Sequence, residues 1–131
     1  MLNIIISLAE FVVGLGIIIY WFLFYKVVKK DSKKSILYIT HEKSFPIADL
    51  CWTMPSLFIA SLGVILSQRF GIFFSIISGS SLIFLGLLDI TFNVQNKVFS
   101  NNISDTIIHL FINLSCLIFG IVFLVFGWLN L

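Results

Sequence analysis

Charged residues are scarce in this chain of 131 residues, where they make up 11% of the sequence while apolar residues make up 60%. Soluble domains are roughly 45–50% apolar and about 25% charged. A water-soluble fold of this length would therefore have too few polar side chains to cover its surface. The composition excludes an ordinary soluble domain and predicts an integral membrane protein with a single domain over 1–131.

Cysteine and histidine are rare as well, with two residues of each. Cys51 and Cys116 form no CxxC pair, which argues against a thiol–disulfide carrier. His109 alone cannot supply both axial ligands of a haem, and His41 is expected in a loop. The Asp and His spacings match no recognised metal motif, so neither a metal nor another cofactor is expected. No Ser or Cys has a convincing base and oxyanion partner, which favours a protein that is not an enzyme.

Four apolar runs are each long enough to cross a bilayer, which takes about 20 helical residues. They cover residues 2–25, 46–66, 70–92 and 106–130. The first run has no Lys or Arg before it and is longer than the core of a signal peptide, so we interpret it as an uncleaved span. The pattern predicts an all-α fold, namely a polytopic membrane protein built as an antiparallel bundle of four transmembrane helices.

Basic residues are concentrated between the first two spans. Six of the eight Lys and Arg residues lie between Lys26 and Lys43, in a Lys-rich loop at 26–45. In a chain that crosses the membrane four times, this loop lies on the same side as the connection between the third and fourth spans, which contains Lys97. Since cytoplasmic loops carry an excess of Lys and Arg, we expect both termini outside and the Lys-rich loop in the cytoplasm of a cell (plasma) membrane protein. Basic residues form no other face, which argues against a nucleic-acid partner.

The second span contains both prolines of the chain. Ser44 is expected to cap its first turn, and Pro46 lies just inside that turn, where a missing N–H costs least. Pro55 lies further along and is expected to kink the helix or to free a backbone carbonyl.

Every span carries a stripe of small and polar residues at spacings of three and four, which place residues on one helix face. The stripes comprise Asn3, Ser7, Glu10, Gly14 and Trp21; Asp49, Thr53, Ser56, Ala60, Gly63 and Ser67; Gly71, Ser75, Ser78, Gly79, Gly86, Asp89 and Asn93; and His109, Asn113, Cys116, Gly120 and Gly127. Small residues allow helices to approach closely, and polar ones hydrogen-bond across them. The four stripes are therefore expected to face one another.

Ionisable residues within the spans are the candidate site residues, because such groups usually face the bundle interior. The candidates near the cytoplasmic end are Asp49, Asp89, His109, Asn93, Asn113 and Trp21. This layer could be a proton relay, a cation site, a ligand anchor, or an interfacial network that holds helix ends together. The indole of Trp21 could equally be an anchor at the membrane interface.

Glu10 lies deeper, about 10 Å from the outer end of its helix at roughly 1.5 Å per residue. No cationic residue is expected at its level. It could exchange a proton or bind a cationic ligand. Alternatively it is a neutral carboxylic acid bonded to a neighbouring hydroxyl, such as that of Ser75.

Leu8-Ala9-Glu10, in the first of four short spans, resembles the segment around the essential glutamate of the small multidrug resistance transporters. In that family this glutamate exchanges protons for cationic drugs. The resemblance implies the same role for Glu10.

A second resemblance rests on an acid followed by Tyr20-Trp21 in the first span. Residues 44–46 (Ser-Phe-Pro) and Asp49 then lead into the second span. This layout resembles the uncharacterised small bacterial membrane proteins of the YvaD type. The resemblance implies a bacterial protein with four spans and assigns no activity to it.

Two functions are favoured by these observations, and an intramembrane enzyme is a third alternative. The first is binding of a small molecule or ion in the polar bundle interior, by a binding protein or a transporter. The second is a non-catalytic accessory, assembly or immunity-type protein, whose stripes only pack and whose Lys-rich loop contacts a cytoplasmic partner or anionic lipid. The lipid bilayer is a partner in both cases. A homodimer fits a transporter, because a single bundle of four helices has a small interior.

Overall fold

The computed structural model describes residues 1–26, 36–97 and 103–131, and every regular element within these ranges is a helix. The elements are α1 (Leu2–Lys26), α2 (Ile36–Glu42), α3 (Pro46–Ala48), the π-helical segment η2 (Asp49–Thr53), α4 (Met54–Ile65), α5 (Arg69–Gln95) and α6 (Ile103–Asn130). The predicted all-α fold is therefore confirmed.

Four helical stretches are long and apolar enough to cross a membrane. They are Leu2–Lys26, Ile36–Ile65, Arg69–Gln95 and Thr106–Asn130. Three of them match the predicted spans closely. The second begins at Ile36 instead of residue 46, because α2 continues the helical stretch into the segment expected to be a loop. The part of that Lys-rich loop at 27–35 lies outside the described residues.

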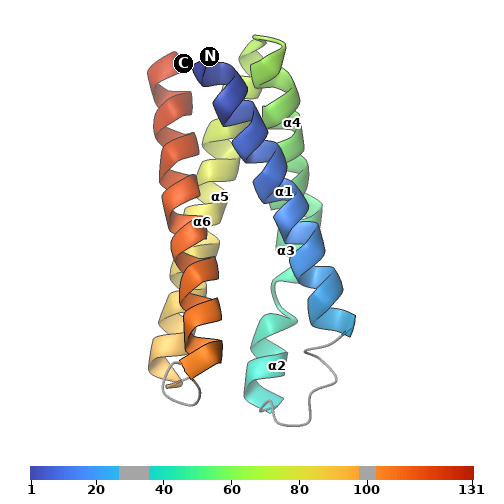
Figure 1. The fold of residues 1–131 in the computed structure, drawn as a ribbon, viewed down its shortest axis with the longest axis vertical. Helices are drawn as coiled ribbons and strands as arrows, with labels where there is room; N and C mark the ends of the chain where they lie inside the picture. The colour runs from blue at the N-terminus through green and yellow to red at the C-terminus, as the bar shows by residue number, and fades with distance from the viewer. Residues whose placement is uncertain (27–35, 98–102) are drawn as a thin grey trace.

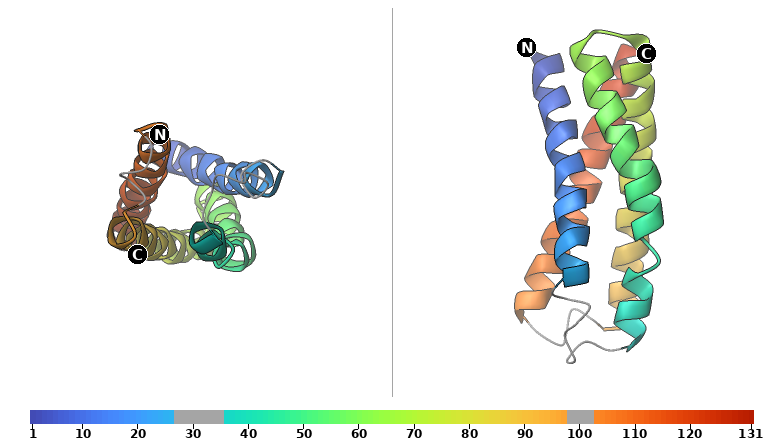
Figure 2. Two further views of the ribbon diagram at one scale, coloured as in Figure 1. Left: turned by 90° about the horizontal axis from the view of Figure 1, so that it is seen from below. Right: turned by 90° about the vertical axis from the view of Figure 1, so that its right-hand side faces the viewer.

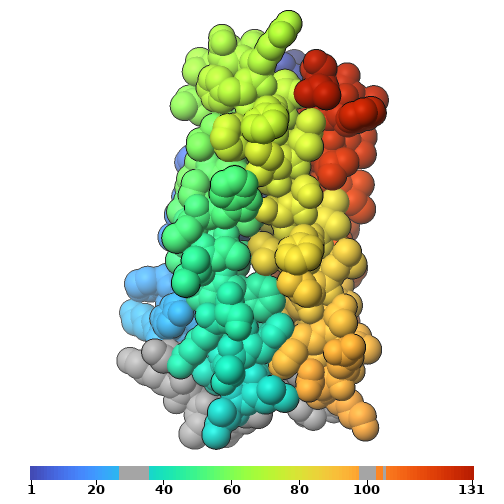
Figure 3. Space-filling model, turned by 180° about the vertical axis from the view of Figure 1, so that it is seen from behind, coloured from blue at the N-terminus to red at the C-terminus, as the bar shows by residue number. Residues whose placement is uncertain are grey.

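The helices form an antiparallel bundle in which α1 packs against α4, α4 against α5, and α5 against α6. Both termini lie at one end, and α2 lies at the opposite end, here called the α2 end (Figures 1 and 2). Figure 3 shows the face on which α4 and α5 run side by side, with α2 below α4 and beside the last turns of α5. Among the described residues, α1 and α6 lack the close packing that joins the other neighbouring pairs.

Glycines of the stripes allow the close helix contacts. A Cβ atom added to Gly63 would lie 2.4 Å from the Cα atom of Gly71, where α4 meets α5. A Cβ atom added to Gly79 would lie 2.6 Å from the carbonyl oxygen of Gly120, where α5 meets α6. No side chain fits at these distances, so small residues are required there. The expectation that the stripes face one another is met at both interfaces.

The second span changes its hydrogen-bonding pattern just before Pro55. The N–H group of Met54 donates to the carbonyl oxygen of Asp49, five residues earlier, and the next residue, Pro55, has no N–H group to donate. The helix therefore has π-helical hydrogen bonding over Asp49–Thr53. Most π-helices in proteins are single turns of this kind inside an α-helix. The predicted distortion around Pro55 takes this form.

The predicted cap of the second span is wrong. Phe45 is the N-cap residue of α3, and no side chain bonds to the first turn. The hydroxyl of Ser44 instead donates to the carbonyl oxygen of Thr40 in the last turn of α2 at 3.2 Å, because α2 ends two residues before Ser44. Pro46 does occupy the first turn, as expected.

Large apolar side chains cover the outside of the bundle. Exposed examples occur on α1, α5 and α6, among them Phe22, Phe84, Phe111 and Trp128. Soluble proteins rarely expose continuous apolar surfaces of this kind. The buried core is small by comparison and is centred on Leu57 and Phe123.

Candidate functional site

A cavity of about 370 Å³ lies between the middle of the bundle and the α2 end, and it opens to the outer surface, since the exposed residues Val12 and Phe111 are part of its lining. Its walls come from α1, α5 and α6, and residues of α2 and η2 complete the lining. Most of the wall is apolar, as at Val13, Ile17 and Leu82. The cavity adjoins the region where α1 and α6 stand apart (Figure 1). Small-molecule sites typically have volumes of about 300–1,000 Å³, so this cavity has the size of a ligand site.

Three carboxyl groups line the cavity, those of Glu42, Asp49 and Asp89. No Lys, Arg or His is present among its described lining residues. The cavity therefore combines apolar walls with an excess of acidic groups. This combination favours a molecule that has an apolar body and a positive charge.

Asp49 and Trp21 join the second span to the first. Asp49 opens the π-helical segment η2, and Trp21 lies in α1. The Trp21 indole N–H donates to Asp49 Oδ2 at 2.8 Å. Trp21 is 3% exposed, so its indole lies inside the bundle and not on the outer surface expected for an interface anchor. The Asp49 carboxyl group is thereby held at the wall of the cavity.

Glu42, the last residue of α2, is buried in the interior. The Tyr20 hydroxyl donates to Glu42 Oε2 at 2.9 Å, whereas Glu42 Oε1 has no hydrogen-bond partner among the described residues. The sequence interpretation missed Glu42 because it assigned this segment to a loop. The signal that could have found it is the spacing of Tyr38 and Glu42, four residues apart and both buried on one face of α2.

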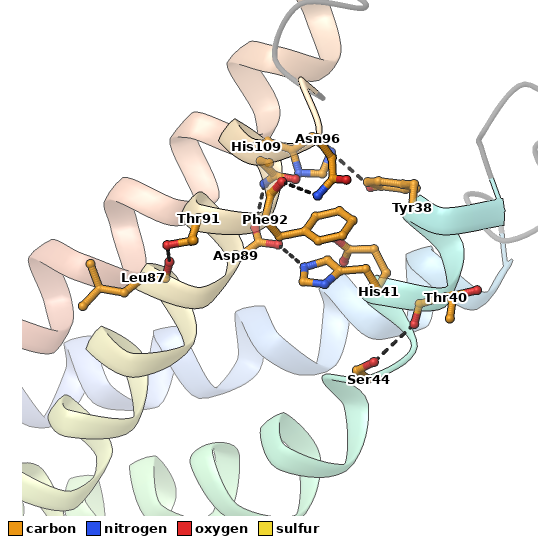
Figure 4. Close-up of polar contacts among 12 residues, drawn as sticks. Tyr38, Thr40, His41, Ser44, Leu87, Asp89, Thr91, Phe92, Asn96 and His109 are labelled. Atoms are coloured by element: carbon orange, nitrogen blue, oxygen red, sulfur yellow. Dashed lines mark hydrogen bonds and ion pairs between the residues drawn. The ribbon is translucent and has the colours of Figure 1, made fainter.

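Asp89 has a partner on each of its carboxylate oxygens. His41 Nε2 lies 3.1 Å from Asp89 Oδ1, and the Asn93 side-chain amide donates to Asp89 Oδ2 at 3.1 Å. The His41 ring stacks in parallel on Phe92 with 3.5 Å between ring centroids (Figure 4). The expected loop position of His41 is wrong, because His41 belongs to α2.

His109 and Asn113 of α6 lie in different surroundings. His109 Nε2 lies 3.0 Å from the Tyr38 hydroxyl, which ties α6 to α2, and His109 is not part of the cavity wall (Figure 4). Asn113 does line the cavity, and its buried side-chain amide nitrogen has no partner among the described residues. Of the expected layer, Asp49, Asp89, Asn113 and Trp21 thus meet at one cavity, Asn93 supports Asp89, and His109 lies apart from it.

Glu10 lies outside this cavity. It is fully buried in α1, and the Ser75 hydroxyl of α5 donates to Glu10 Oε1 at 2.5 Å, which confirms the pairing named as one alternative. Its other oxygen, Oε2, has no partner among the described residues. Glu10 therefore forms a separate polar contact between α1 and α5.

The candidate site is thus an apolar cavity with an acidic lining between the first, third and fourth long helices. It can hold an apolar molecule and pair a positive charge with carboxyl groups that approach from α2, η2 and α5. Comparison of this chain with family models, with curated proteins and with solved structures finds no match.

Proposed function

We propose that this chain is a multi-pass protein of the cell membrane that binds an amphipathic cation in the cavity between α1, α5 and α6. One observation carries the proposal: a cavity of about 370 Å³ has mostly apolar walls, three carboxyl groups and no Lys, Arg or His among its described lining residues. Ligand sites typically combine apolar walls with a few polar groups that fix the orientation of the ligand. A protonated amine or a quaternary cation with an apolar body suits both features.

Electrostatics in the membrane interior favour a positively charged occupant. Buried carboxylates are expensive in an apolar environment unless they are paired. Among the described residues, Trp21 is the one donor to Asp49, and one oxygen of Glu42 has no partner. A cation in the cavity would pair with these groups, while the apolar walls would exclude water from the contact and strengthen it.

The proposed membrane setting also supplies a route of entry. Four helical stretches are long and apolar enough to cross a bilayer, and the cavity adjoins the gap between α1 and α6. An amphipathic molecule dissolved in the lipid could enter sideways through this gap. Lys26, Lys43 and Lys97 support a cytoplasmic location for the α2 end, with both termini outside.

The cavity supports a role for Asp49 more directly than one for Glu10. The resemblance to the small multidrug resistance transporters rests on Glu10, which lies outside the cavity. Binding is therefore proposed here on the carboxyl groups of the cavity. Transport would be an additional step, which flux into liposomes would measure.

The test is binding of tetraphenylphosphonium, a lipophilic cation, to the purified protein in detergent with EDTA present. Wild-type protein should bind it saturably, and at least about tenfold more tightly than the neutral analogue triphenylphosphine oxide. Asp49→Asn removes a carboxylate and should weaken binding by about tenfold, which corresponds to about 1.4 kcal/mol. Gly16→Leu should also weaken it, because Gly16 lines the cavity and a Cβ atom there meets nothing within 4 Å.

Glu10→Gln is the matched control, since it neutralises a buried carboxyl group outside the cavity. It should bind the cation as the wild type does, and melting temperatures should establish that each variant is folded. Wild-type affinity in both Asp49→Asn and Gly16→Leu would contradict the proposal. That result would favour the accessory-protein alternative, in which the polar groups only hold helices together.

A further inference from the structure

His41 and Glu42 at the end of α2 approach Asp89 of α5, and one potential ligand atom from each of the three lies within 4.8 Å of the others. We propose that these three side chains form a binding site for a first-row divalent transition-metal ion, such as Zn²⁺ or Mn²⁺. Neither the sequence patterns nor the proposed binding of an organic cation assigns this site. From the sequence, His41 and Glu42 were expected in the Lys-rich loop and were not among the candidate site residues.

An unpartnered oxygen atom distinguishes this cluster from ordinary side-chain contacts. Glu42 is 3% exposed, and its Oε1 atom has no hydrogen-bond partner among the described residues. Buried polar atoms are nearly always paired, and an unpaired carboxylate oxygen is especially unfavourable. A metal ion held between Glu42, His41 and Asp89 would give this oxygen the partner that it lacks.

The other atoms of the cluster are already held in place by neighbours. The Tyr20 hydroxyl donates to Glu42 Oε2, and the Asn93 amide donates to Asp89 Oδ2. In metal sites, such outer hydrogen bonds fix the orientation of the ligating carboxylates. They leave Glu42 Oε1 and Asp89 Oδ1 as the oxygens that could face an ion.

The imidazole ring of His41 is fixed by two aromatic rings. Phe92 stacks on it in parallel (Figure 4), and Phe45 meets it edge-on with 4.9 Å between centroids. Its Nε2 atom points at Asp89 Oδ1, 3.1 Å away. Metal–ligand distances of about 2.0–2.2 Å are typical of Zn²⁺ with nitrogen and oxygen. Side-chain shifts of less than about 1 Å would then close the three ligands around one ion.

The ligand types determine which ions suit the site. One imidazole nitrogen with two carboxylate oxygens suits Mn²⁺, Fe²⁺ or Zn²⁺, whereas Mg²⁺ and Ca²⁺ prefer ligand sets made of oxygen alone. Three protein ligands leave coordination positions open. Because Glu42 and Asp89 also line the cavity, a water molecule in the cavity could occupy such a position.

The experiment is a calorimetric titration of EDTA-stripped, dialysed protein in detergent with ZnCl₂ and, separately, with MgCl₂. Wild-type protein should bind one Zn²⁺ per chain and show no saturable Mg²⁺ binding at the same concentrations. His41→Gln and Glu42→Gln should each weaken Zn²⁺ binding by at least about tenfold. Tyr20→Phe, which removes the hydrogen bond to Glu42, should weaken it by about tenfold, as is typical of outer-sphere partners.

Two controls separate this site from the proposed cavity ligand. Asp49→Asn removes a cavity carboxylate outside the cluster and should leave Zn²⁺ affinity unchanged. His41→Gln should keep the affinity for tetraphenylphosphonium in EDTA, because His41 does not line the cavity. Co²⁺ gives an independent readout: the visible absorption of the wild-type complex should be lost in His41→Gln. Wild-type Zn²⁺ affinity in both His41→Gln and Glu42→Gln, or an absence of saturable wild-type binding, would overturn the inference.

Discussion

Ser75 and Glu10 exemplify how single buried polar side chains are held in this bundle. The Ser75 hydroxyl lies 2.5 Å from Glu10 Oε1 and 3.0 Å from the carbonyl oxygen of Gly71. Both side chains are fully buried, so no solvent can replace a lost contact. Glu10 Oε2 has no hydrogen-bond partner among the described residues. The hydrogen bond from Ser75 is therefore the main polar contact of this buried carboxyl group.

Ser75→Ala should therefore destabilise the protein by about 0.5–2 kcal/mol, the range expected for a hydrogen bond between helices in a membrane protein. Thermal unfolding in detergent would measure the change. Thr91→Ala is a suitable control, since the exposed Thr91 hydroxyl donates to the Leu87 carbonyl oxygen of its own helix, and its effect should stay within about 0.5 kcal/mol. Equal effects of the two substitutions would show that the contact with Glu10 contributes nothing specific.

At the scale of the helices, some neighbouring pairs approach closely at glycine residues, whereas α1 and α6 stand apart. The α5–α6 pair is closest at Gly79 and Gly120, where a Cβ atom would collide with backbone. In α1, by contrast, Gly16 has nothing within 4 Å of the position of a Cβ atom and borders the cavity. The same residue type thus permits packing in one place and leaves room in another.

Gly79→Ala should destabilise the bundle by about 1–3 kcal/mol, the usual penalty for overpacking, because the added methyl group would lie 2.6 Å from the Gly120 carbonyl oxygen. Gly16→Ala should be neutral or stabilising by up to about 1 kcal/mol, since alanine favours a helix and meets no neighbour. Melting temperatures of the two variants in the same detergent would test the contrast. A neutral Gly79→Ala would mean that α5 and α6 approach less closely than described here.

The second span brings two acidic residues to the cavity at the same scale. Glu42 and Asp49 are seven residues apart, which is close to two full turns of a helix, so their spacing favours one face. Both do line the cavity, although the helix is interrupted between α2 and α3. The acidic lining therefore agrees with the spacing of these residues along the second span.

At the scale of the whole molecule, both termini lie at one end and the α2 end lies opposite (Figure 1). This arrangement agrees with four spans. In the proposed orientation, the α2 end faces the cytoplasm and both termini lie outside. The α2 end carries Lys26, Lys43 and Lys97, whereas the opposite end has Arg69 as its basic side chain among the described residues.

Alkaline phosphatase, which is active only outside the cytoplasm, should be active when fused after Leu131 and inactive when fused after Lys97. The expected pattern follows from the excess of Lys at the α2 end. Enzyme activity in a bacterial host, normalised to the amount of fusion protein, would measure it. The reverse pattern would place the α2 end outside and would contradict the proposed orientation.

The sequence by itself determined the features that depend on local periodicity. Four apolar runs of sufficient length specify four long helices, and stripes at spacings of three and four specify which faces meet. The contact between Glu10 and Ser75 could be named in advance because each residue lies on such a stripe. Most candidate site residues near the cytoplasmic end were identified for the same reason. Four of them do meet at the cavity, namely Asp49, Asp89, Asn113 and Trp21.

Only the tertiary structure decided which helices stand apart. It also decided which side chains outside the long regular helices reach the site. His41 and Glu42 were not recognised because their helix has only seven residues, and short helices are stable only through tertiary contacts. His41, and not the expected His109, pairs with Asp89 because α2 lies beside the last turns of α5 (Figure 3). The cavity exists because α1 and α6 stand apart, which depends on the packing of all four helices and leaves no periodic trace in the sequence.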